Sequence, residues 1–463
     1  MTRMKKLTFL LSVVLLAGCH SFTQDSYQRP SLSLVSNEGA KNTGQSWLQR
    51  SPHWWKTFND PLLSQAIEQV LVSNNDLAAA GIRLHQARLD AGLTRTNLTP
   101  DVSVSGNASN SKNTRKMTDS QESYSASVEL SYEIDLWGKL AKSREQSEWL
   151  VRASEMDRQN TALLLIGNTA QFYWQIANLN QQIRNTQNSV LLAKRSEAAV
   201  LSRFNAGSVS QLDLLQAHQQ VIDLQTSLRD QQQQRQEVRN SLAILFNRSP
   251  SQRVAERTSL DLTQIIALEV DQPLEVIAHR PDIQAAEMQL RASLAGTEVA
   301  KLNFYPTISL SAALGASSDL FRDWFSNPAR TLGSSVALPF VQWNTVQLTV
   351  ERADLDAQQA ALTFQNKVYT ALSDVDKAMT QRETWQLKRQ AAAESKSLNQ
   401  RRLELAQSQY LSGAVPIDSW LDAQSSLLNA ENTFSDSQYG YLNTTMQLWL
   451  ALGGETILEL PQR

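Results

Sequence analysis

Four segments of the chain alternate between apolar and polar residues, the pattern of a strand with one apolar face. The clearest runs from Tyr124 to Leu136, where every second residue is apolar and the residues between are serine or acidic. A shorter alternation begins at Val102. The sequence predicts two hairpins, with strands at about 101–109, 123–136, 307–317 and 331–341.

The longest alternation covers about 13 residues, which is long for a strand of a globular protein. It suits a membrane strand, which needs about 9–11 tilted residues and turns its apolar face to lipid. An ordinary antiparallel sheet in a soluble α+β domain is the alternative. We favour the membrane strand, because isolated hairpins need a sheet partner and neither half of the sequence contains another strand-like segment.

The pattern after each hairpin changes to that of long helices. Between Lys139 and Asn205 there is no proline, and Gly167 is the only interior glycine. Such a helix would be about 100 Å long, more than the diameter of a small globular domain. Apolar residues of the returning helix recur at steps of three and four, which predicts coiled-coil packing. Four long helices are predicted, at about 139–206, 210–247, 345–411 and 416–452.

The chain contains an internal tandem duplication. Gly207 and Gly413 lie 206 positions apart in similar segments. Further pairs at the same spacing are Asp76 with Asp282, Pro100 with Pro306, and Trp137 with Trp343. The duplication predicts two structural repeats, at 61–270 and 271–463. We expect Gly207 and Gly413 to form the turns between paired long helices.

The N-terminus has the features of a secretory signal. Residues 1–18 contain a basic start followed by an apolar stretch that is too short to span a bilayer. They end directly before Cys19, and this junction resembles a bacterial lipobox, which implies lipidation of Cys19. A plain signal with a chance cysteine is the alternative. No aspartate follows Cys19, which favours the outer membrane, and 19–60 is expected to be an irregular anchored segment.

Composition and motifs exclude several functions. The formal net charge is −2, so there is no bulk basic field for nucleic acid. The five histidines are scattered without metal-site spacing, and no phosphate loop or nucleophile elbow occurs. We therefore expect no enzyme activity, no cofactor and no metal site.

A chain with four such strands cannot close a barrel by itself, because about eight strands are the practical minimum. Open strand edges are not stable in lipid. Several chains must therefore share one barrel; two copies would give eight strands and three would give twelve.

Three motifs resemble the TolC family of outer membrane factors: Asn75-Asp76-Leu77, Arg280-Pro281-Asp282-Ile283 and Phe304-Tyr305-Pro306. Two others resemble the lipoprotein branch of that family: Tyr27-Gln28-Arg29-Pro30 and Trp54-Trp55-Lys56 through Asp60-Pro61. The resemblance implies a mixed α/β membrane protein in the outer membrane. Three copies would form a twelve-stranded β-barrel, continued by a periplasmic tunnel of twelve helices. The tunnel would dock on a periplasmic adaptor and an inner-membrane pump, making the protein a passive, gated duct.

The resemblance also implies a gate at the helix tips. Asp418 and Asp422 are four residues apart and share a helix face, and in a trimer they could form a ring of six carboxylates. Early acids that stabilise the helix dipole are the alternative. Asp213 and Tyr410 match positions that hydrogen-bond between the tips, although a buried structural tyrosine is equally compatible with the sequence. Ser419 and Val415 depart from the family pattern.

Aromatic residues at two other places allow two readings each. Trp137 and Trp343, where strand changes to helix, could belong to an interfacial belt or pack at the junction. Phe321, Trp324 and Phe325 could narrow the outer mouth or pack together. The leading function is drug efflux. Peptide or type I protein secretion, metal-ion efflux and a non-porous periplasmic coiled-coil lipoprotein are the alternatives.

Overall fold

The computed structural model describes residues 53–112, 115, 119–260 and 277–454. The predicted signal at 1–18, Cys19 and most of the segment 19–60 lie outside the described residues. All elements described below belong to one compact unit, residues 37–463.

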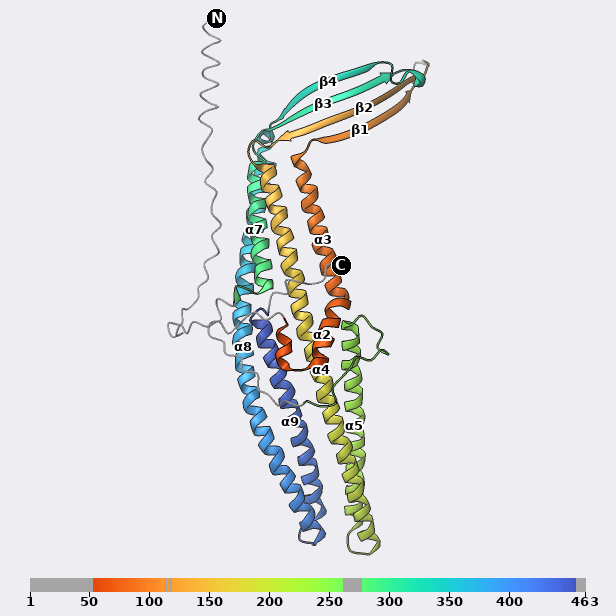
Figure 1. Ribbon diagram of the computed structural model, residues 1–463, viewed down its shortest axis with the longest axis vertical. Helices are drawn as coiled ribbons and strands as arrows, with labels where there is room; N and C mark the ends of the chain where they lie inside the picture. The colour runs from red at the N-terminus through yellow and green to blue at the C-terminus, as the bar shows by residue number, and fades with distance from the viewer. Residues whose placement is uncertain (1–52, 113–114, 116–118, 261–276, 455–463) are drawn as a thin grey trace, which may run out of the picture. The chain divides into compact units, whose positions relative to one another are not determined.

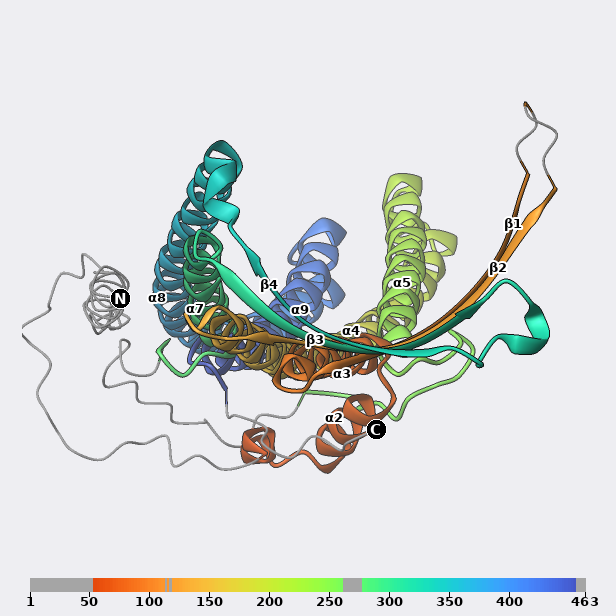
Figure 2. The same ribbon diagram turned by 90° about the horizontal axis from the view of Figure 1, so that it is seen from above.

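The two predicted hairpins join in one antiparallel sheet of four strands. Its strands are β1 Asp101–Ser111, β2 Gln121–Ile134, β3 Thr307–Ser318 and β4 Pro328–Ala337. They follow one another in the order β1-β2-β3-β4 (Figure 2). Because β2 pairs with β3, each hairpin is the sheet partner of the other.

The register separates an apolar from a polar face. Every pair joins residues of the same parity, such as Val104 with Val128 and Ala312 with Leu332. The even-numbered residues of β1 to β4 are mostly Val, Leu, Ile, Ala and Tyr, and we call their side the apolar face. The odd-numbered residues are mostly serine with several acids, and their side is the polar face.

Two predicted strands end earlier than their alternation suggested. The segment predicted at 123–136 leaves the sheet after Ile134, because the Asp135 carboxylate accepts the Leu140 and Ala141 N–H groups (3.0 and 2.8 Å) at the start of the next helix. The segment predicted at 331–341 ends at Ala337. Pro339 has no N–H for a strand ladder, and it begins the 3-10 helix η4 (Pro339–Gln342) instead.

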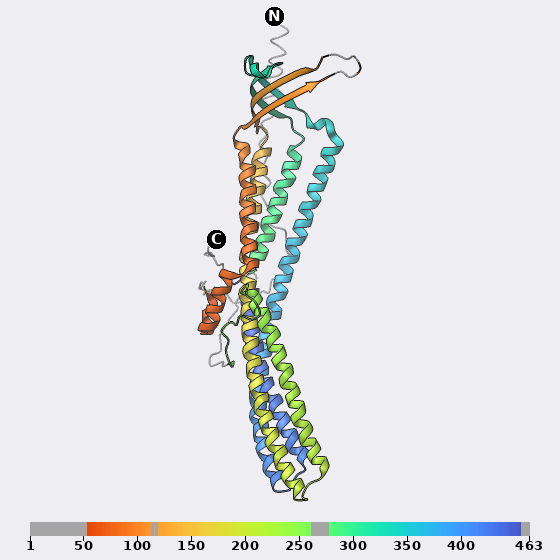
Figure 3. The ribbon, with the colours of Figure 1, turned by 90° about the vertical axis from the view of Figure 1, so that its right-hand side faces the viewer.

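Seven α-helices lie in the described residues. They are α2 Pro61–Ser73, α3 Asn75–Arg95, α4 Lys139–Asn205, α5 Gln211–Leu245, α7 Pro281–Leu302, α8 Trp343–Leu411 and α9 Ile417–Ala451. The helix α4 packs against α3, α5, α7 and α9, and α8 packs against α7 and α9 (Figure 1, Figure 3). Among the described residues, no helix has both the length and the hydropathy that crossing a membrane requires.

Several equivalent elements of the two repeats begin or end at residues that lie 206 positions apart. The helices α5 and α9 begin and end 206 positions apart, as do the first residues of β1 and β3. After α5 the chain turns through Asn247 (φ 53°), and after α9 it turns through Gly453 (φ 92°), again 206 positions later. The two repeats therefore fold alike although few of their residues are identical.

In each repeat the start of one helix meets the end of another, α3 with α5 and α7 with α9. The Asn74 side chain caps α3 at Leu77 N (3.0 Å) and donates to the Leu245 carbonyl at the end of α5 (2.9 Å). In the second repeat, Arg280 before α7 donates to the Ala451 carbonyl at the end of α9 (3.2 Å). Each tether satisfies a helix-terminal carbonyl that has no partner in its own helix.

The largest hydrophobic cluster lies where α2 covers α4 and α9, and it contains Trp55, Leu63, Tyr173 and Trp449. The buried Asp60 carboxylate caps α2 and accepts a hydrogen bond from the Tyr173 hydroxyl (3.2 Å). Burial and the nearby Asp60 charge raise the pKa of Tyr173. These contacts fix the start of the first repeat against α4.

The contact between α4 and α9 also contains polar side chains that hydrogen-bond across it. Side-chain bonds across it join Asn178 to Asp436 (2.7 Å), Asn185 to Asn432 (3.2 Å) and Gln424 to Ser196 (2.8 Å). Burial raises the pKa of Asp436, and the amide donors of Asn178 and Gln182 oppose that rise. These paired polar groups add directional contacts to the apolar clusters that also join the two helices.

Replacing Gly440 by alanine is expected to destabilise the packing of α9 on α8. A Cβ atom at this position would lie 2.4–2.6 Å from three atoms of the Trp385 ring. Overpacking of this kind costs about 1–3 kcal/mol. The midpoint of thermal unfolding, followed by circular dichroism in detergent, should fall.

The matched control is Gly92→Ala in α3, where a Cβ would have no neighbour within 4 Å. That change should be neutral or raise the midpoint, because alanine is the better helix former by about 1 kcal/mol. Equal midpoints for the two variants would contradict the tight α8–α9 contact.

Candidate functional site at the helix tips

The long helices of each repeat turn back at equivalent glycines, at the ends of the helices away from the sheet (Figure 1). Gly207 and Gly413 have φ angles of 73° and 80°, in the left-handed region that glycine adopts without strain. Their N–H groups donate to the carbonyls of Phe204 and Tyr410 (2.9 and 3.0 Å) and so close each helix end. Both predicted turn residues thus occupy turns of the same design.

Asp418 and Asp422 lie exposed on the first turns of α9. Their neighbours Ile417 and Leu421 are buried in a cluster with Val200 of α4, so the carboxylates lie on the opposite, solvated side of the helix. Within the described part of the chain, no group of three or more His, Cys, Asp and Glu side chains could hold a metal ion. Both acids are open to solvent in this chain, and their place in the aperture stays a prediction.

The structure does not bring the Asp213 carboxylate and the Tyr410 hydroxyl together. Asp213 is the third residue of α5 and belongs to a capping box with Ser210, whose backbone N–H and hydroxyl donate to the carboxylate (2.7 and 2.8 Å). A capping acid is held by its own helix end, which is why it does not reach the other hairpin.

Tyr410 is buried against α9. Its side chain is 4% exposed, and its ring stacks on Trp420 at 5.1 Å. Among the described residues, neither the Tyr410 hydroxyl nor the Trp420 indole N–H has a hydrogen-bond partner. Within this chain, Tyr410 acts through its ring, in agreement with the structural alternative given above.

Arg203 joins the two tips, a role that the sequence did not reveal. Its guanidinium lies over the Tyr410 ring at 4.9 Å and donates to the Tyr410 carbonyl at 3.2 Å. It therefore connects the end of α4 to the end of α8. One signal was available in the sequence, because the equivalent position in the second repeat is Gln409, so the arginine is not a feature of the repeat itself.

Both junction tryptophans contact the segment before β3, Trp137 from the first repeat and Trp343 from within the second. The Trp137 indole N–H donates to the Pro306 carbonyl (2.8 Å), and its ring lies 5.1 Å from that of Tyr305. Trp343 contacts the Phe304 ring in an edge arrangement at 6.2 Å. Packing at the junction is thus present, although both tryptophans remain partly exposed.

The aromatic residues of the loop between β3 and β4 lie over the apolar face. Trp324 lies 3.8 Å from where a Cβ of Gly106 would be, and Gly106 belongs to that face. The rings of Phe321 and Trp324 also contact Tyr124 (5.5 and 5.8 Å). The rings therefore pack together on the side opposite to the polar face, which disfavours the alternative of a constriction.

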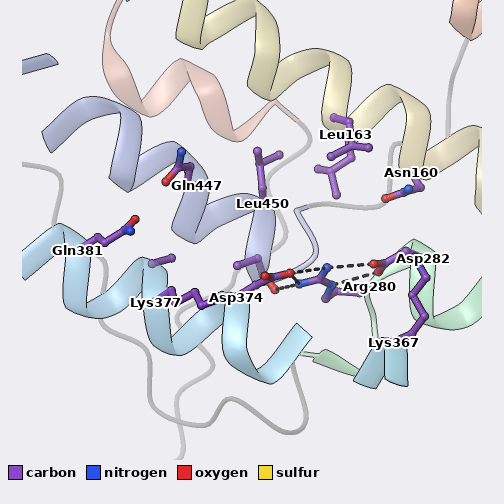
Figure 4. A pocket seen from close by; sticks show the side chains of 13 residues that line it. Asn160, Leu163, Arg280, Asp282, Lys367, Asp374, Lys377, Gln381, Gln447 and Leu450 are labelled. Carbon is purple, nitrogen blue, oxygen red and sulfur yellow. Dashed lines mark hydrogen bonds and ion pairs between the residues drawn. The ribbon is translucent and has the colours of Figure 1, made fainter. Parts of the chain in front are cut away.

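A pocket of about 440 Å³ lies between α4 and α8, where α9 ends and α7 begins (Figure 4). Arg280 pairs there with Asp282 (2.9 Å) and Asp374 (3.4 Å). Burial alone would lower the pKa of Arg280, but its hydrogen bonds to Asp282 and the charges of both acids raise it. The ion pairs hold the α7–α9 tether in place, so a structural role accounts for these charges.

Comparison with known proteins identifies the family. The family described as outer membrane efflux protein matches residues 66–248 and 273–454, one range in each repeat. The chain belongs to this family. It is therefore an outer membrane component of efflux and not an enzyme, as the sequence predicts.

Individual relatives match along nearly their whole length. The pyoverdine export outer membrane protein OpmQ of Pseudomonas putida is 30% identical, over 94% of this chain and 95% of that protein. The probable outer membrane lipoprotein SilC of Salmonella typhimurium is 27% identical, over 97% and 98%. A crystal structure of CusC has the same fold, with a TM-score of 0.83 at 24% identity, covering 92% of this chain and 98% of that one.

Replacing Arg203 by glutamine should loosen the tip of α8. The change removes the cation from the Tyr410 ring and one hydrogen bond, interactions worth about 1–2 kcal/mol together. Amide exchange of residues 408–412, measured by mass spectrometry, should therefore become roughly tenfold faster.

Tyr410→Phe serves as the control for this experiment. It keeps the ring under Arg203 and removes a hydroxyl that has no partner among the described residues. Its exchange should match that of the wild type. Faster exchange in Tyr410→Phe than in Arg203→Gln would show that the hydroxyl, and not the guanidinium, holds the tip.

Proposed function

We propose that three copies of this chain form the outer-membrane duct of a tripartite efflux system. In this proposal the duct is passive and gated, and a periplasmic adaptor and an inner-membrane pump deliver drugs or other small molecules to it. The observation that carries the proposal is that both layers of the chain end in edges that only further copies can cover.

The helical layer ends in an exposed apolar stripe on α8. Leu348, Leu355, Leu362 and Tyr369 are spaced seven residues apart and are 64%, 57%, 61% and 43% exposed. A seven-residue repeat of this kind is the seam of a coiled coil. A different side of α8, which includes Phe364 and Val368, is already buried, so the stripe is free for a helix of another copy.

The opposite edge of the layer offers a matching surface. In α3, Ile82 and Leu89 are also seven residues apart and are 60% and 55% exposed. Nearer the tip, α5 exposes Leu212 and Leu215. Lateral contact of α8 with α3 and α5 of a neighbouring copy would bury both stripes and close a ring of helices.

The sheet poses the same problem. Within the described residues, β1 and β4 each pair along one side only. Unpaired strand edges are unfavourable in lipid, where no water satisfies their backbone groups. In a closed ring of three copies, twelve strands would turn the apolar face to lipid and the polar face to a water-filled lumen. Three copies, not two, follow from the resemblance to the family.

The tips would form the periplasmic aperture of this duct. We infer that the exposed side of α9 lines the narrow end, where threefold symmetry would bring six carboxylates from Asp418 and Asp422 together. Such a ring favours cations over anions. Opening would move the hairpins about the Gly207 and Gly413 turns, and the contact of Arg203 with Tyr410 would resist that movement.

The remaining parts of the proposal concern anchoring and cargo. Acylation of Cys19 would tether each copy to the membrane; the lipobox motif supports it, and a relative bears the name of an outer membrane lipoprotein. Small-molecule cargo is favoured because the relative OpmQ is named for pyoverdine export.

Replacing Leu362 by aspartate should dissociate the trimer, because it places a carboxylate in each apolar interface. The mass in detergent, measured by light scattering, should fall from three chains to one. Thr363→Asp adds the same charge next to the stripe and should leave the trimer intact. A wild-type chain that is already monomeric in detergent would contradict the shared duct.

The acids can be tested by the selectivity of single channels in a planar bilayer. Asp418→Asn combined with Asp422→Asn should lower the permeability ratio of potassium over chloride by about twofold or more, because six charges leave the mouth. Asp418→Glu with Asp422→Glu keeps the charge and should conserve the ratio. The absence of any wild-type current would favour a non-porous coiled-coil lipoprotein over a duct.

A further inference from the structure

The apolar face carries one cation whose presence the fold alone does not explain. Among the residues of β1 to β4, Arg330 and Glu122 are the charged side chains on that face. Glu122 accepts a hydrogen bond from the Tyr124 hydroxyl (3.0 Å). Arg330 is exposed, and within the described residues no carboxylate pairs with it.

The position of Arg330 along β4 indicates the depth at which its side chain would lie in a membrane. It pairs with Leu314 and lies two residues from Pro328, the first residue of β4 after the loop. A charged side chain on a lipid-facing strand is unfavourable at the centre of a bilayer and nearly neutral close to its surface. Arg330 therefore belongs at the level of the lipid headgroups, with its apolar neighbours at the level of the acyl chains.

Aromatic rings mark the same level on the same face. Trp324 overlies Gly106, which belongs to the cross-strand row of Ala126, Ala316 and Pro328. Arg330 belongs to the adjacent row on the same face. Phe321 and Phe325 are 66% and 74% exposed beside Trp324, in the loop that joins β3 to β4. Amphipathic and aromatic side chains concentrate at membrane interfaces.

We propose that Arg330 and this aromatic loop bind the phosphate-bearing headgroup of a lipid in the outer leaflet. The inference rests on the proposed function, which turns the apolar face to lipid. The guanidinium offers two parallel N–H donors to phosphate oxygens, which an ammonium group does not. In the proposed ring β4 of one copy adjoins β1 of the next, so arginines and aromatic loops alternate around the outer rim.

The charges near the β3–β4 loop indicate which arginine would bind the phosphate. Arg322 is also exposed, but Asp323 lies 3.4 Å from it and partly neutralises it. Asp319 and Glu122 add negative charge around the loop, so the loop itself does not attract an anion. Of the two arginines in the β3–β4 hairpin, Arg330 is therefore the one expected to contact the anion, and Arg322 provides a matched control.

The test uses the full trimer in detergent and a diphosphorylated lipid A, compared with the same lipid lacking its phosphates. Binding is measured by native mass spectrometry and by the shift of the thermal midpoint. The wild type should retain the phosphorylated lipid at least tenfold more tightly than the dephosphorylated one. Arg330→Gln should lose that preference, Arg330→Lys should keep part of it, and Arg322→Gln should behave as the wild type.

Three results would overturn the inference. The first is that Arg330→Gln prefers the phosphorylated lipid as strongly as the wild type does. The second is that Arg322→Gln loses this preference as fully as Arg330→Gln. The third is that inorganic phosphate stabilises the trimer as strongly as the lipid does. Channel current in a bilayer of uncharged lipid separates this inference from the proposed function. A trimer that conducts but binds both lipids equally would contradict this inference alone. A wild type without current would contradict the proposed duct.

Discussion

Uncovered edges are the constraint on which the rest of this structure depends. A sheet of four strands has two edges whose backbone groups need partners, and a layer of helices has two edges whose apolar residues need cover. The internal duplication lets the two hairpins pair with each other through β2 and β3, and it leaves the outer edges of the sheet unpaired. The chain therefore has uncovered edges on both layers, and the proposed duct would form when further copies cover them.

Polar contacts act together with the apolar clusters to align the helices within that segment. The end-to-end tethers of Asn74 and Arg280 hold short helices in line over the breaks between them. Hydrogen bonds donated by side-chain amides of α4 to α9 help to fix the register of these two helices. Because such bonds are directional, they select one arrangement of long helices that could otherwise slide along one another.

The tip shows how a family pattern can be kept while one of its contacts changes. Gly207 and Gly413 form the predicted turns, but the Asp213 carboxylate is occupied by the cap of its own helix. Arg203 provides the link between hairpins, through the ring and carbonyl of Tyr410. The coupling of the two tips therefore includes a cation over an aromatic face, beside the apolar cluster of Val200, Ile417 and Leu421.

The sequence by itself determined the elements and their duplication, because strands and helices differ in the period of their apolar residues and because left-handed turns require glycine. It predicted the long helices α4 and α8 to within a few residues of their observed ends, and the strand ends less well where Asp135 and Pro339 acted locally. Only the tertiary structure decided the partner of Asp213, the role of Arg203, and the face on which Trp324 lies. These depend on contacts between residues far apart in the chain, and a pattern of period two or 3.6 contains no information about which distant side chain fills a given space.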